Sequence, residues 1–123
     1  MSSDSTSYRK LTSDQQLDDV FSAPAERTVV VFKHSLTCPI STAALREFER
    51  FLDHRGGSEG QGGDFDATLI EIQPNRPLSS RVAERTGVRH ESPQALVLRG
   101  GEVAWHASHW SITADSLKAA VEA

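Results

Sequence analysis

The sequence predicts an α/β domain with a mixed central sheet of about four strands between two layers of helices. Three observations support this prediction. Residues 28–32 are an unbroken β-branched and apolar run, which is typical of a strand covered on both faces. Apolar residues recur at helical spacing after Pro39. Two further apolar segments, 94–98 and 103–106, flank a short turn that contains two glycines, which is typical of a hairpin.

The composition indicates one globular domain. A chain of 123 residues can bury one hydrophobic core, and 37% hydrophobic with 24% charged residues is ordinary for a globular protein. The net charge of −4 is mixed along the chain, so neither a nucleic-acid surface nor a cationic membrane face is expected. No apolar run is long enough to span a bilayer. The N-terminal segment lacks the apolar region of a secretory signal, so we expect a cytoplasmic protein.

The predicted domain begins after a short tail. Residues 1–10 are rich in serine and aspartate, so we expect a flexible N-terminal tail, with one domain spanning residues 11–123. Ser13 and Gln16 form a capping-box pattern at the start of a first helix, and Pro24 ends it. The strand at residues 28–32 follows.

A long helix is expected after Pro39, because the apolar stripe continues as far as Leu52. Glycines near residues 56–57 suit a left-handed cap at its end. Residues 56–64, GGSEGQGGD, are predicted to link this helix to the next strand. A phosphate-binding loop is the weaker interpretation, because no Lys-Ser/Thr pair follows the glycines.

The second half of the chain predicts a strand at residues 65–72 and then a helix, which Asn75-Arg76-Pro77 introduces and Gly87 closes. The hairpin at 94–106 and a last helix capped by Thr113 complete the chain. A strand-helix-strand unit followed by a helix, a hairpin and a final helix is the layout of a thioredoxin-like domain. This is an analogy at the level of the fold and does not by itself assign a function.

Cys38 is the only cysteine in the chain, and it precedes Pro39 at the predicted start of the long helix. Proline is favoured at the first helical position and disfavours helical dihedrals in the preceding residue, so Cys38 is predicted to be the N-cap. The unpaired N–H groups and the positive end of the helix dipole stabilise a thiolate there. The hydroxyl groups of Thr37 and Ser41 can hydrogen-bond the sulfur. The alternative is that Cys38 is a small buried hydrophobic residue.

Ser41 stands three residues after Cys38, where dithiol oxidoreductases carry a second, resolving cysteine. Without that thiol, Cys38 can form a mixed disulfide but cannot resolve it internally, so an external thiol must complete the cycle. This predicts monothiol exchange with a low-molecular-weight thiol. Lys33 and His34, which follow the predicted strand, can add positive charge, although the sequence does not orient them.

The Ser92-Pro93 pair directly precedes the predicted strand at 94–98. In a thioredoxin-like fold a cis-proline loop faces the cysteine, and the backbone just before the proline pairs with the substrate as an added strand. A trans proline that simply starts a strand is the alternative. Beside Cys38 as the candidate catalytic residue, the candidate substrate-binding residues are therefore Thr37, Pro39, Ser41, Ser92 and Pro93.

Other chemistries have less support in the sequence. The histidines lack the paired spacing of a zinc site and one cysteine supplies too few soft ligands, so no metal site is predicted. A bridging iron–sulfur cluster with external thiols stays open as an alternative. Trp105 and Trp110 are expected to pack in the core or against the hairpin.

Three segments resemble the monothiol bacilliredoxins, the YtxJ-like proteins of the bacillithiol system. They are KHSLTCPIS at residues 33–41, HESPQ at 90–94 and ASHWSIT at 107–113. The resemblance covers the chain from about residue 11 onward, and the first two motifs are fairly specific only in combination. It implies a thioredoxin-like fold and the removal of bacillithiol from protein mixed disulfides. By position it makes Cys38 the nucleophile, with Ser92 and Pro93 in the substrate-facing loop.

The resemblance implies two kinds of partner, S-thiolated client proteins and a bacillithiol-like thiol that acts as co-substrate, with no bound cofactor. The oligomeric state stays open. A second function also stays open, a non-catalytic thioredoxin-like binding module such as a stress-response adaptor or a monothiol iron–sulfur carrier. The missing resolving cysteine motivates it, because ordinary dithiol turnover is excluded.

Overall fold

The computed structural model describes residues 8–57 and 65–122 of the 123-residue chain. In chain order the elements are β2 (Arg9–Lys10), α1 (Asp14–Phe21), β3 (Thr28–His34), α2 (Pro39–Gly57), β4 (Phe65–Glu71), η1 (Gln73–Asn75), α3 (Arg76–Thr86), β5 (Gln94–Arg99), β6 (Glu102–Ser108), η2 (His109–Ser111) and α4 (Ala114–Glu122). No helix among these residues is long and apolar enough to cross a membrane.

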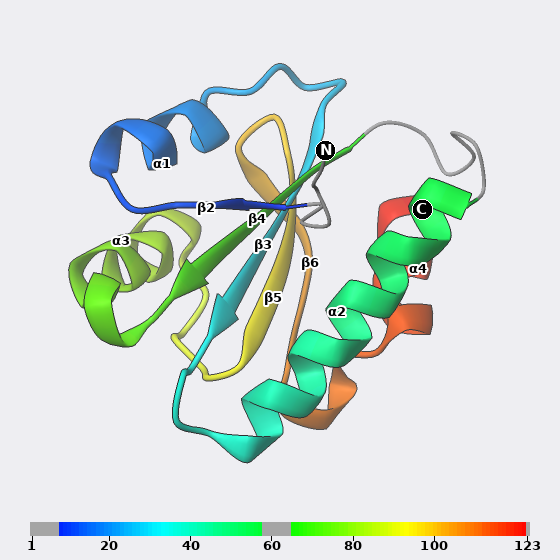
Figure 1. Cartoon of the computed structure of the whole chain (residues 1–123). Coiled ribbons are helices and arrows are strands. Elements are labelled where there is room, and N and C mark those ends of the chain that lie inside the picture. Colours follow the sequence, from blue (N-terminus) through cyan, green and yellow to red (C-terminus); the bar gives the residue numbers. More distant parts are fainter. Residues whose placement is uncertain (1–7, 58–64, 123) are drawn as a thin grey trace, which may run out of the picture.

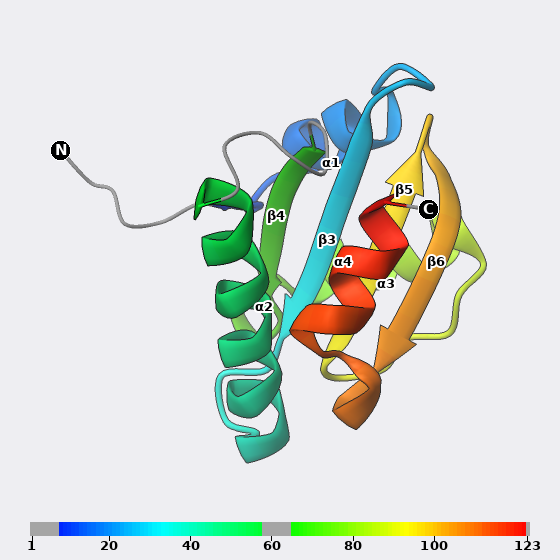
Figure 2. The ribbon, with the colours of Figure 1, turned by 90° about the vertical axis from the view of Figure 1, so that its right-hand side faces the viewer.

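The strands form one mixed sheet in the order β2-β4-β3-β5-β6. Strands β2 and β3 run parallel to β4, whereas β5 is antiparallel to both β3 and β6. Helices α1 and α3 cover one face of the sheet, and α2 and α4 cover the other (Figures 1 and 2). The predicted three-layer α/β architecture is confirmed, and the sheet has one strand more than predicted.

The additional strand, β2, lies in the segment that the sequence assigned to a flexible tail. Arg9 and Lys10 pair with Thr68 and Leu69 of β4, and Leu11 is fully buried. The tail prediction is therefore wrong for these residues, while residues 1–7 lie outside the described part of the chain. A strand of two residues is too short to show an alternating pattern of apolar and polar residues. Its position therefore depends on pairing with a neighbouring strand, which the sequence pattern does not reveal.

Strand β3 is the centre of the sheet and is buried along its whole length. This confirms the strand that the β-branched run predicted, and β3 continues two residues further, through Lys33 and His34. The predicted strand ended at Phe32 because Lys33 and His34 are polar. The register pairs Val31 with Thr68 of β4 on one side and with Leu96 of β5 on the other.

The long helix α2 begins at Pro39, as predicted, and aromatic packing holds it against the sheet. The rings of Phe32 and Phe48 stack with centroids 5.0 Å apart, and those of Phe51 and Phe65 stack at 5.2 Å. These contacts join α2 to β3 and β4. The start of α2 therefore has a defined position beside the carboxyl end of β3.

The opposite face has a separate apolar core, in which Leu17 of α1 and Leu78 and Val82 of α3 pack against the sheet. The capping box of α1 is present: the Gln16 N–H donates to Ser13 Oγ at 3.3 Å, and the Ser13 N–H donates to Gln16 Oε1 at 3.2 Å. Helix α3 ends at Thr86, and its C-cap residue Gly87 has φ of +75°, as predicted from the glycine that closes the helix. Of the predicted linker at 56–64, residues 56–57 belong to α2, so the prediction is wrong for them, and residues 58–64 lie outside the described part of the chain.

Candidate functional site

Cys38 lies in the short connection between β3 and α2, and its side chain is partly exposed. The Thr42 N–H donates to the Cys38 carbonyl oxygen at 3.1 Å, which is the first hydrogen bond of the helix. Since α2 begins at Pro39, this bond makes Cys38 the N-cap residue, as the sequence predicted. The partial exposure argues against the alternative of a buried structural thiol.

The loop that carries Cys38 is held by Gln73 of η1, a residue that the sequence analysis missed. Gln73 Oε1 accepts from the Leu36 N–H at 2.9 Å. Its Nε2 donates to Ser35 Oγ at 3.0 Å and to Thr37 Oγ1 at 3.3 Å. Gln73 follows β4, which is parallel to β3, so both strands deliver their carboxyl ends to this edge. That shared edge is the signal by which Gln73 could have been found.

Ser41 was expected to hydrogen-bond the sulfur and to contact substrate, and the structure gives it a different place. Its side chain is fully buried, on the face of α2 that packs against the sheet. Its Oγ accepts from the Ser35 N–H at 2.8 Å and is bonded to His34 Nδ1 at 2.8 Å. Within the described residues no hydrogen bond joins Ser41 to Cys38 Sγ. Ser41 therefore anchors the loop from inside, and its side chain does not line the groove beside Cys38.

The structure does not place a positive charge of Lys33 or His34 next to Cys38. Burial lowers the pKa of His34, so its imidazole, stacked on Phe32 at 6.1 Å, is neutral near pH 7. Lys33 is fully buried, and its Nζ donates to the carbonyl oxygen of Ser79 on α3. Adjacent residues of a strand point to opposite faces of the sheet, so Lys33 and His34 have different neighbours. The sequence alone does not show which residues those neighbours are.

The Ser92–Pro93 peptide bond is cis, as the thioredoxin-like layout predicted. The register pairs Lys33 with Gln94, so one further step along both strands brings Pro93 beside His34, at the end of β3 next to the Cys38 loop. On its other side, the Pro93 carbonyl oxygen accepts from the His109 N–H at 3.1 Å. Within the described residues, the backbone of Ser92 forms no hydrogen bond. That backbone is available to a strand added by a substrate.

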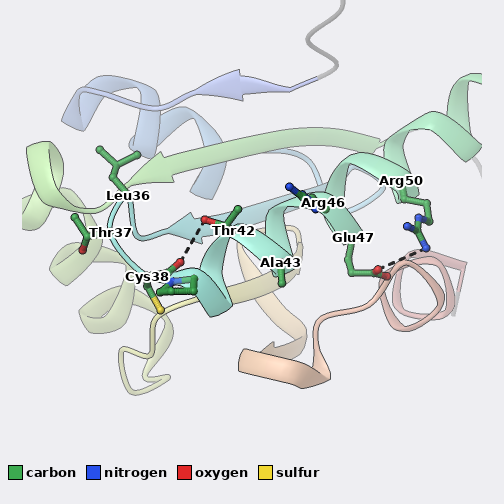
Figure 3. A pocket seen from close by; sticks show the side chains of 9 residues that line it. Leu36, Thr37, Cys38, Thr42, Ala43, Arg46, Glu47 and Arg50 are labelled. Carbon is green, nitrogen blue, oxygen red and sulfur yellow. Dashed lines mark hydrogen bonds and ion pairs between the residues drawn. The ribbon is translucent and has the colours of Figure 1, made fainter.

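A groove of about 610 Å³ starts at Cys38 and follows the outer surface of α2 (Figure 3). Cys38 and Arg50 lie at its two ends. Glu47 accepts from the Ala114 N–H at 2.9 Å and lies 3.6 Å from Arg50 in an ion pair. The lining residues are Leu36, Thr37, Cys38, Pro39, Thr42, Ala43, Arg46, Glu47 and Arg50. Among the predicted site residues the groove brings together Thr37, Cys38 and Pro39, whereas Ser41, Ser92 and Pro93 lie outside it.

Two large apolar side chains are exposed in the described part of the chain, and both lie at the Cys38 end of the sheet. Leu36 is 49% exposed, and Trp110 is 69% exposed. Trp110 follows His109, whose N–H is bonded to Pro93, and η2 contacts α2. Trp110 was expected to pack in the core or against the hairpin, and its exposure shows that it is not a core residue. Trp105 is half-buried against the core on the α2 side, as predicted.

The arrangement offers a partly exposed thiol at a helix start, next to a backbone segment with unused hydrogen-bonding capacity. Such a site suits attack on a sulfur atom that an extended chain presents. Within residues 8–57 and 65–122 no group of three or more His, Cys, Asp or Glu residues is placed to hold a metal ion.

Comparisons with known proteins agree with this geometry. A family model described as monothiol bacilliredoxin BrxC matches residues 9–117. A solved structure described as having a thioredoxin fold is 37% identical, covers 93% of each chain and has a TM-score of 0.79. Thioredoxin from Trypanosoma brucei brucei is 14% identical with a TM-score of 0.70, covering 98% of this chain and 93% of its own.

A mutant thioredoxin from Halobacterium salinarum NRC-1 is 20% identical with a TM-score of 0.66, covering 93% of this chain and 87% of its own. At such identities these two thioredoxins show the fold alone. Together with the more similar structure, they confirm the predicted thioredoxin fold.

Proposed function

The chain belongs to the monothiol bacilliredoxin family, and from this we propose that it is a thiol–disulfide exchange protein that acts through Cys38. The family match and the thioredoxin fold support a thiol redox function. The observation that carries the more specific proposal is the position of Cys38. It is the one cysteine of the chain, partly exposed at the N-cap of α2, with serine at the position of a resolving cysteine.

The proposed reaction has two exchange steps. The Cys38 thiolate attacks the sulfur of the small thiol in a mixed disulfide with a client protein. The disulfide between client and small thiol breaks, the client leaves as a thiolate, and a new disulfide joins Cys38 to the small thiol. A second small thiol then attacks this disulfide, which restores the Cys38 thiolate and releases a disulfide of two small thiols. Overall, the client sulfur is reduced and the incoming small thiol is oxidised, because the small thiol that the client carried was already in a disulfide.

We assign the small thiol as bacillithiol or a similar low-molecular-weight thiol, acting as co-substrate, with no bound cofactor. The groove beside Cys38 offers it the surface of Thr37 and Pro39. The client would add as an extended segment along the unpaired backbone of Ser92, next to Pro93. The proposed setting is the cytoplasm, where a free thiol is kept reduced.

The test uses a client protein that carries bacillithiol on a single cysteine. The chain, its Cys38→Ala variant and a Ser80→Ala control are each incubated with this client and free bacillithiol. Ser80 is exposed on α3 and stands outside the site, so its variant should act like wild type. We expect wild type and control to release the client thiol and the Cys38→Ala variant to do nothing above background. Mass spectrometry of the intact wild-type chain should show bacillithiol on Cys38.

Two results would contradict the proposal. One is equal release by wild type and Cys38→Ala, and the other is no release by either. A Cys38→Ala chain that keeps the cellular phenotype of wild type would favour the non-catalytic binding module instead.

A further inference from the structure

Lys33 is a buried charge that the proposed chemistry does not use. Its side chain is fully buried in the central strand, and no described ion pair involves it. Nζ lies 3.0 Å from the Ser79 carbonyl oxygen and 3.2 Å from His90 Nδ1. Burial lowers the pKa of Lys33 to about 8. An ammonium without a carboxylate partner is costly to bury, so packing alone does not explain this lysine.

The partners of Lys33 connect it to the segment that contains the cis-proline. His90 Nδ1 is one partner, and Ser79 Oγ also lies 3.3 Å from that nitrogen. Gln94, paired with Lys33 across the two strands, is 1% exposed, and its Nε2 donates to the Arg89 carbonyl oxygen at 2.9 Å. Lys33 and Gln94 thus hold the segment at Arg89 and His90, just ahead of Ser92–Pro93.

The same cluster has unused capacity. Gln94 Oε1 is buried and has no hydrogen-bond partner among the described residues. The ammonium of Lys33 carries three N–H donors, and two of them are used by Ser79 and His90. The two residues are neighbours in register across β3 and β5. A buried donor of Lys33 and a buried acceptor of Gln94 are thus both left over beside the segment that precedes the cis-proline.

We propose that Lys33 is a positioning residue for thiol exchange: its ammonium donates to His90 Nδ1 and so holds the segment 90–93, with its unpaired Ser92 backbone, in place beside Cys38. This inference rests on the proposed function, in which that backbone receives the client. Lys33 acts from the opposite side of the sheet to the phenylalanine stack that positions α2. The thiol and the client-binding backbone are thus held by separate sets of contacts.

The test compares wild type with Lys33→Met, which keeps the length of the side chain but removes its donors and charge. Lys118→Met is the matched control, because Lys118 is exposed on α4. We expect Lys33→Met to lower kcat/KM for exchange with a thiolated client by roughly tenfold, mainly through KM, since small misplacements at a binding edge are costly. The rate at which iodoacetamide alkylates Cys38 should stay unchanged, because that reaction does not use the Ser92 backbone.

A second readout follows His90 by NMR titration. Burial, and then the charge of Lys33, lower the pKa of His90, and Arg76 acts in the same direction while Glu91 opposes it. We expect Lys33→Met to raise the titration midpoint of His90 and Lys118→Met to leave it unchanged. His90→Ala, at an exposed residue, should reproduce the rise in KM, and combining it with Lys33→Met should add little.

The outcomes separate this inference from the proposed function. If wild type performs no exchange, the proposed function fails, while the His90 titration still reports the contact between Lys33 and His90. If wild type exchanges and both Lys33→Met and His90→Ala leave KM unchanged, the positioning role is wrong. An alkylation rate that falls together with the exchange rate would also overturn it, because Lys33 would then act on the Cys38 thiol itself.

Discussion

Ser41 shows at the residue scale how a serine at the resolving position becomes part of the loop structure. Its hydroxyl sits where a second thiol would remove the need for an external one. The structure uses that hydroxyl to satisfy two buried groups, the Ser35 N–H and His34 Nδ1. In the proposed reaction the same residue leaves the exchange cycle open, and in the structure it fixes the loop that carries Cys38. Its burial fits both roles, because it contacts the sheet and not the groove.

Replacing Ser41 with alanine should destabilise the fold. The Ser35 N–H and His34 Nδ1 would lose their partner inside the protein, and an unsatisfied buried polar group costs about 1–3 kcal/mol. Urea denaturation should show this as a lower midpoint with an unchanged slope. Thr42→Ala is the control, since the Thr42 hydroxyl is exposed, and its effect should stay within about 0.5 kcal/mol. Equal midpoints for the two variants would contradict the anchoring role.

The β5–β6 turn shows at the element scale how a hairpin depends on a neighbouring helix. Gly100 and Gly101 have φ of +61° and +81°, a region that favours glycine. The position of Gly101 is also crowded, because a Cβ there would collide with the carbonyl oxygen of Phe21 at the end of α1. Glycine is therefore needed at Gly101 for two reasons: the positive φ of its backbone and the close packing of the turn against α1.

Gly101→Ala should accordingly cost more than Gly87→Ala. Gly87, after α3, also has a positive φ of +75°, but no atom lies within 4 Å of the Cβ it would gain. Gly87→Ala should lose about 1 kcal/mol from backbone strain alone. Gly101→Ala should lose that amount and a further collision term of about 1–3 kcal/mol. Thermal denaturation of both variants checks the order, and a smaller loss at Gly101 would show that the turn moves freely away from α1.

At the scale of the whole molecule, the buried Lys33 makes the free energy of unfolding depend on pH. Burial lowers its pKa from 10.5 to about 8 in the folded protein. Between these two values the unfolded chain holds more protons than the folded chain, so the free energy of unfolding contributed by Lys33 rises with pH. Below about pH 8 the full cost of burying the charge is present. That cost is on the order of 3 kcal/mol.

Lys33→Met should therefore be more stable than wild type at pH 7, by on the order of 3 kcal/mol, because it removes the buried charge. This advantage should shrink as the pH rises from 8 toward 10.5, because wild type then sheds the buried charge. Urea denaturation of wild type, Lys33→Met and Lys118→Met at pH 7, 8, 9 and 10 measures the trend. Curves for Lys33→Met and wild type that stay parallel over this range would refute it.

Local chemistry made much of the site predictable from the sequence. Pro39 marks the helix start, so the N-cap position of Cys38 follows from the preferences of two adjacent residues. Apolar periodicity predicted β3 and α2, and the capping box predicted the start of α1. These features depend on a few neighbouring residues, and their physics is contained in the sequence itself.

Contacts between distant segments were beyond such reasoning. Strand β2 forms because it pairs with β4. Gln73, which follows the end of β4, holds the Cys38 loop through a hydrogen bond to Leu36. The exposure of Trp110 depends on how η2 lies against the cis-proline loop. In each case the partner lies many residues away, and no periodicity encodes it.

The sequence by itself determined that this protein has one thiol, at the start of a helix, with serine in place of a second thiol. Only the tertiary structure decided what surrounds that thiol. It directed Ser41 inward, placed Ser92–Pro93 beside the end of β3, and buried Lys33 against His90. The physical reason is that local propensities choose helices and strands, whereas the partners of a buried polar group are chosen by the packing of the layers.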